Sequence, residues 1–97
     1  MTSNHKLTAV LKGRTITGTH HQDHRLIMTF DDGSMMTVNT SGATTSAATG
    51  GTIAKVRQRD TQLALDFEDG ATMLIPLAEA TSSVMVRAND HTLEYAD

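Results

Sequence analysis

The stretches that decide the fold are residues 25–38, RLIMTFDDGSMMTV, and residues 62–75, QLALDFEDGATMLI. They belong to a longer internal match, because a shift of 37 positions lays residues 13–38 on residues 50–75 without a gap, with 9 of 26 positions identical. Unrelated windows of average composition match at only about one position in fifteen. The match therefore indicates two copies of one supersecondary unit.

Each copy has the pattern of a β-hairpin. In the first copy, Leu26, Met28 and Phe30 alternate with other residues, and this period of two is typical of a strand with one face on a core. A three-residue loop after this strand brings the apolar residues of both strands onto one face, whereas a two-residue loop does not. The resulting pairs are Phe30 with Ser34, Met28 with Met36, Leu26 with Val38, Phe67 with Ala71, Leu65 with Met73 and Leu63 with Ile75. We therefore predict a type I turn with a G1 bulge and a left-handed glycine, at Gly33 and at Gly70.

Another extended run precedes each hairpin, at residues 14–21 and 51–58. Its apolar positions lie three apart, as Ile16 and Thr19 do, and neither face of a regular strand accommodates that spacing. A β-bulge would accommodate it. The register of these two runs stays open.

The segments around the two copies complete the predicted architecture. Residues 5–12 favour a short helix with Asn4 as its N-cap and Gly13 at its end, although an extended segment is the alternative. Its apolar face would carry Leu7, Val10 and Leu11. Residues 39–52 contain only Asn, Thr, Ser, Gly and Ala, which predicts an exposed connection, and residues 84–96 predict a C-terminal hairpin.

We thus expect residues 1–97 to form a single all-β domain that is mainly antiparallel. Its two tandem β-meander repeats, residues 13–38 and 50–75, would form a small barrel or a two-layered roll, with one short N-terminal helix as a possible addition. Each repeat is too small to be stable alone.

Composition narrows the classes of partner and compartment. The 97 residues carry a net charge of −3, with 8 Lys and Arg that are scattered along the chain. This charge gives no basic patch for nucleic acid or for an anionic membrane, so we expect neither as a partner. The apolar run at residues 7–11 is too short for a signal peptide or a membrane span, and the sequence contains no cysteine. We expect a cytoplasmic protein.

One cluster suggests metal chemistry, namely His20, His21 and His24 around Asp23. Imidazole nitrogen suits Zn²⁺, Ni²⁺ or Cu²⁺, and a Gln22–Asp23 loop would make His21 and His24 a cross-strand pair. However, neighbouring strand residues point to opposite faces, and the second copy has no histidine at the matching positions. We therefore favour solvated turn residues and predict no metal, with this site as the alternative hypothesis.

The predicted function is binding of a protein partner or self-assembly as a homo-oligomer, by a small non-enzymatic β module whose open strand edges pair in a homodimer. We expect no catalytic residues and no cofactor, because the sequence shows no nucleophile beside a base and no glycine-rich phosphate loop. The alternative function is a transition-metal-binding module that uses the three histidines.

Overall fold

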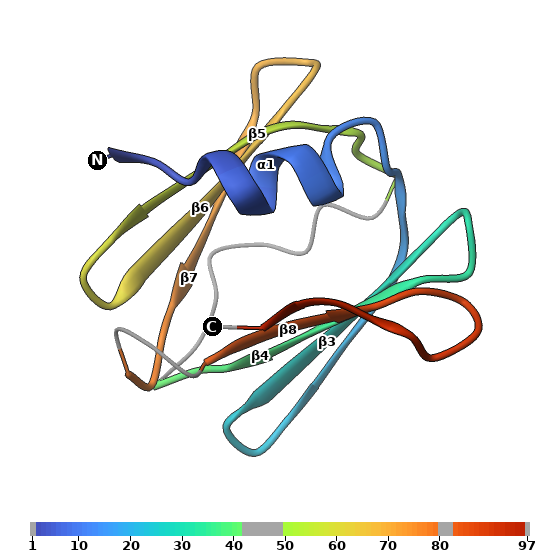
Figure 1. The fold of residues 1–97 in the computed structure, drawn as a ribbon. Coiled ribbons are helices and arrows are strands. Elements are labelled where there is room, and N and C mark those ends of the chain that lie inside the picture. The colour runs from blue at the N-terminus through green and yellow to red at the C-terminus, as the bar shows by residue number, and fades with distance from the viewer. Residues whose placement is uncertain (1, 42–49, 80–82, 97) are drawn as a thin grey trace.

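The computed structural model describes residues 2–41, 50–79 and 83–96, and it is mainly antiparallel β (Figure 1). The helix is α1 (His5–Leu11). The strands are β1 (Thr2–Ser3), β2 (Ile16–Gln22), β3 (Arg25–Phe30), β4 (Met35–Asn39), β5 (Ile53–Arg59), β6 (Gln62–Phe67), β7 (Thr72–Pro76), β8 (Val84–Arg87) and β9 (Leu93–Ala96). They form a four-stranded sheet in the order β1-β5-β6-β7 and a five-stranded sheet in the order β2-β3-β4-β8-β9. The predicted all-β class with one N-terminal helix is confirmed, and the two sheets form layers, not a closed barrel.

Both β-hairpins have the register that the apolar pattern predicts. Met28 lies opposite Met36, and Leu65 lies opposite Met73. The three-residue loops end in glycines with positive φ, 85° at Gly33 and 91° at Gly70. The predicted register and turn are thus confirmed. A slip by one residue would turn the buried residues of one strand towards solvent.

The predicted bulge is present in β2 and in β5. The register shifts by one residue between Ile16 and Gly18 and again between Ile53 and Lys55. This extra residue lets apolar positions three apart share the inner face, so Ile53 and Val56 are both fully buried.

The two sheets meet through the same backbone bonds at positions 37 residues apart. At one end, Thr15 bridges Thr52, and their hydroxyl oxygens lie 2.8 Å apart. At the other end, Thr40 bridges Leu77. Matching backbone pairs surround these bridges: Ile16 N–H to Gly51 O and Ile53 N–H to Arg14 O, Asp31 N–H to Thr15 O and Glu68 N–H to Thr52 O, Thr40 N–H to His24 O and Leu77 N–H to Thr61 O.

Helix α1 covers the side of the β5 strand (Figure 1). The Asn4 side chain accepts a hydrogen bond from Leu7 N–H at 3.0 Å, which confirms the predicted N-cap. The apolar face of the helix buries Leu7 and Leu11 completely, and Gly13 follows with φ of 87°. Burial of this face stabilises a helix that is too short to form alone in water.

One apolar core fills the space between the two sheets and under the helix. Its buried members come from all three layers and include both phenylalanines. They are Leu7, Leu11, Ile16, Leu26, Met28, Phe30, Met36, Val38, Ile53, Val56, Leu63, Leu65, Phe67, Met73, Ile75, Leu77, Val84 and Val86.

The two loop glycines give a matched pair of mutations. Gly33→Ala and Gly70→Ala impose the same backbone strain, which should cost about 1–2 kcal/mol of unfolding free energy each. A Cβ at Gly33 would also lie 2.9 Å from the Cβ of Asn89, whereas a Cβ at Gly70 meets nothing within 4 Å. Urea denaturation should therefore show the larger loss for Gly33→Ala, and equal losses would contradict this packing.

Candidate interaction surface

The outer face of the four-stranded sheet is charged. Arg57 donates two hydrogen bonds to the carboxylate of Asp66, at 2.7 and 2.9 Å, and Lys55 and Arg59 lie on the same side of β5. The hydrogen bonds from Arg57 hold the pKa of Asp66 below its ordinary value. A face of this kind is well solvated, and its carboxylate is paired within the chain.

The outer face of the five-stranded sheet carries fewer charges, with Arg25 and Arg87 among its residues, and part of it is apolar. The positions 37 residues before Lys55, Arg57, Arg59 and Asp66 hold no Lys, Arg, Asp or Glu; they are Gly18, His20, Gln22 and Thr29. In the part of the chain that the structure describes, the exposed large hydrophobic residues are Met85, 39% exposed, and Leu93, 49% exposed. Both belong to the strands that extend this sheet beyond β4, so its outer side offers apolar surface to a partner.

A groove hollows this sheet near one end of its strands. Its volume is about 570 Å³, and its walls come from β3, β4, β8 and β9 together with the residue before β8. The lining residues are Arg25, Thr37, Asn39, Ser83, Val84, Met85 and Ala96. A second hollow of about 380 Å³ adjoins it, shares Arg25 and Asn39, and reaches the β2–β3 turn. Arg25 forms no ion pair with any residue of the described ranges, so its guanidinium is available to a ligand.

The three histidines of the alternative metal site do not converge. Gln22 pairs with Arg25, so the turn consists of Asp23 and His24, and the Gln22–Asp23 loop does not form. Asp23 occupies the left-handed region, with φ of 54°, which aspartate tolerates at turns. His21 consequently lies opposite Leu26, not opposite His24.

The side chains of β2 also separate the histidines. His21 Nε2 lies 3.4 Å from the hydroxyl of Thr40, whereas its neighbour His20 lies on the other side of the strand. Within residues 2–41, 50–79 and 83–96, no group of three or more His, Cys, Asp or Glu side chains could hold a metal ion.

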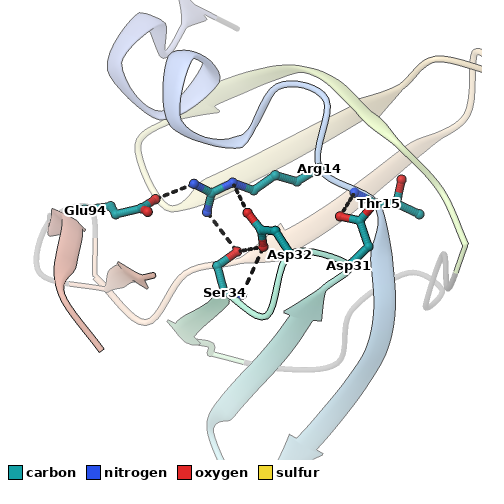
Figure 2. Close-up of polar contacts among 6 residues, drawn as sticks. All are labelled: Arg14, Thr15, Asp31, Asp32, Ser34 and Glu94. Carbon is teal, nitrogen blue, oxygen red and sulfur yellow. Dashed lines mark hydrogen bonds and ion pairs between the residues drawn. The ribbon is translucent and has the colours of Figure 1, made fainter. Parts of the chain in front are cut away.

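Sequence reasoning missed a polar cluster around Arg14 (Figure 2). The guanidinium donates to Ser34 Oγ at 2.9 Å and to Glu94 Oε2 at 2.5 Å, and its Nε lies 3.3 Å from Asp32 Oδ2. Ser34 in turn donates its hydroxyl and its backbone N–H to Asp32. These hydrogen bonds, first that from the Ser34 side chain, hold the pKa of Asp32 below its ordinary value.

This cluster ties β9 to the β3–β4 turn. Arg14 is 17% exposed and Ser34 is 2% exposed, so the hydroxyl of Ser34 is out of reach of a substrate and the guanidinium has three protein partners. A signal was present in the sequence, because the second copy has Gly51 and Ala71 at the matching positions. A polar pair that one copy has and the other lacks indicates a contact specific to that copy.

The chain matches no protein-family model, no curated protein and no solved structure. In the described ranges, no helix has the length and the apolar character needed to cross a membrane.

Proposed function

We propose that this chain is a non-enzymatic protein-binding module and that its five-stranded sheet contacts another protein chain. The observation that carries the proposal is the contrast between the two outer faces. The face of the four-stranded sheet carries the Arg57–Asp66 ion pair, whereas the other sheet exposes Met85 and Leu93. Solvated charge disfavours a protein interface, and exposed apolar surface on a sheet favours one.

The groove defines the chemistry of the partner. Met85 and Ala96 give the groove apolar walls. Arg25, whose guanidinium has no ion pair within the described ranges, lines both the groove and the second hollow. A partner that inserts an apolar side chain and places a carboxylate beside it would satisfy both features. The net charge of −3 supports a protein over a nucleic acid as the partner.

We further propose that the two halves arose by duplication of a unit of about 37 residues, and that they diverged on their outer faces. The matching backbone bonds on both sides of the Thr15–Thr52 bridge support this origin. The inner faces kept their apolar residues because both halves build one core, whereas the face that gained β8 and β9 became available for binding. The absence of cysteine is compatible with the cytoplasm as its compartment.

Site-specific photo-crosslinking in the cells that produce the protein tests this proposal. Thr37 lines the groove, and Thr72 lies on the outer side of the other sheet, exposed in β7. With p-benzoylphenylalanine at Thr37, illumination should give a covalent adduct with another polypeptide, and Met85→Lys in the same chain should abolish it. The probe at Thr72 is the matched control and should give no adduct. Absence of the adduct at Thr37, or equal adducts at both positions, would refute the proposal.

A further inference from the structure

The outer edge of β5 is covered by the N-terminal segment of the same chain. Strand β1 pairs with it, with Ser3 opposite Arg57. Beyond β1, Val56 O accepts a hydrogen bond from Asn4 N–H at 2.9 Å, and Val56 N–H donates to the hydroxyl of Thr8 at 3.0 Å. Both backbone groups of Val56 therefore point away from β6 and have partners.

The matching edge in the other half is β2, and from Thr19 onwards no described residue covers it. Thr19 stands 37 positions before Val56 and has the same register, since Thr19 lies opposite Met28 as Val56 lies opposite Leu65. Its backbone N–H and C=O therefore point away from β3, and those of His21 do the same two residues later. Strand β2 ends the order of its sheet. At the start of this edge, Ile16 N–H donates to Gly51 O and Ile16 O accepts from Gly50 N–H, but from Thr19 onwards no backbone group of the described ranges bonds to the edge.

The sequence of this edge lacks the features with which natural proteins block strand pairing. Residues 16–22, ITGTHHQ, contain no Lys, Arg, Asp, Glu or Pro, whereas the edge strand β7 ends in Pro76. With seven residues, β2 is as long as β5 and longer than the other strands of its own sheet. The end of the β2–β3 hairpin also projects from the body of the molecule (Figure 1).

We infer that β2 pairs antiparallel with β2 of a second copy about a two-fold axis at His20. The inference goes beyond the proposed function, because it adds a contact between the β2 edges of two copies to the contact proposed for the outer face. Pairing between two copies of the same strand about a two-fold axis is self-complementary and closes the contact. Because the strand carries no charged residues, no like charges lie opposite each other.

The bulge selects the register. Because the ladder is irregular between Ile16 and Gly18, the regular part of the edge offers the outward backbone groups of Thr19 and His21. Placing Thr19 opposite His21 of the second copy uses all of these groups in four hydrogen bonds. A shift by two residues in one direction would pair His21 with His21 and leave both groups of Thr19 unpaired in each copy. A shift in the other direction would involve the bulge. The chosen register joins the two five-stranded sheets into one sheet of ten strands.

Disulfide trapping tests both the partner and the register. In this register His20 faces His20 of the second copy as a non-hydrogen-bonded pair, a geometry close enough for a disulfide. The chain contains no cysteine, so His20→Cys introduces a single thiol, and mild oxidation should convert most of the protein to a covalent dimer. Thr72→Cys is the matched control on the edge strand β7 and should stay monomeric.

Edge blocking gives the second test. Thr19→Pro removes an outward N–H and no bond to β3, and Thr72→Pro makes the same change on β7. In sedimentation equilibrium at about 100 µM, a concentration that populates dimers of micromolar affinity, the wild type and Thr72→Pro should be dimeric. Thr19→Pro should raise the dissociation constant at least about tenfold and should block the His20→Cys disulfide, while its circular dichroism spectrum stays that of the wild type.

The outcomes separate this inference from the proposed function. A chain that stays monomeric, or a His20→Cys variant that forms no more disulfide dimer than Thr72→Cys, overturns the pairing at β2. If the photo-crosslink at Thr37 still forms in that monomeric chain, the proposed function stands and only the pairing at β2 falls. If the disulfide dimer forms but Thr37 gives no adduct, the pairing stands and the proposed role of the outer face falls.

Discussion

Leu65→Ala should lower the free energy of unfolding by about 2–5 kcal/mol, because it leaves a cavity in the core that the surrounding side chains fill only in part. Leu65 is fully buried in β6, opposite Met73. A domain of this size has about 5–15 kcal/mol of stability in total, so the variant should lose a large part of it. Urea denaturation followed by far-ultraviolet circular dichroism measures the loss.

The control for this variant is the same change at the surface. Leu93 is 49% exposed in β9, and Leu93→Ala should change the unfolding free energy by less than about 0.5 kcal/mol. A Leu65→Ala variant that is as stable as Leu93→Ala would mean that the two sheets do not pack on each other as described.

Arg14→Met should be the second most damaging of the proposed changes, with a loss of about 2 kcal/mol. Methionine keeps the apolar stem of the side chain but loses the guanidinium, so Ser34, Asp32 and Glu94 lose their common donor. Because the bond to Glu94 joins residues 80 positions apart, the amides of β9 should also lose protection in hydrogen exchange.

Arg87→Met is the matched control, because Arg87 donates only to the backbone oxygen of His91 in an exposed loop. Its effect on stability should stay below about 0.5 kcal/mol. If Arg14→Met left the exchange of residues 93–96 unchanged, the cluster would not be what holds β9 in place.

The inner face of the fold could be predicted from the sequence, because buried apolar residues alternate with exposed residues along each strand. That pattern placed Met28 opposite Met36 and required a bulge near Ile16, and both are present. The Asn4 cap was equally local, since the side chain binds an amide three residues away. Each of these features depends on residues that are close in the chain or that share one core.

The outer face and the turn at Asp23 could not be predicted in the same way. Solvent-facing positions carry no periodic signal, so the exposure of Met85 emerges only when β8 is known to pair with β4. The turn depends on the positive φ of Asp23, which the sequence permits but does not require. The contact of Arg14 with Glu94 joins residues 80 positions apart, so no pattern among neighbouring residues predicts it.

The cover that β1 and α1 provide for β5 has a consequence for synthesis. These residues are synthesised before their partner strand, which follows about 50 residues later, since Ser3 pairs with Arg57. A seven-residue helix is not stable by itself in water. Strand β1 and helix α1 must therefore stay unfolded until β5 has been made and can pair with them. Because its contacts are so distant in sequence, folding should also be slow for a chain of this length.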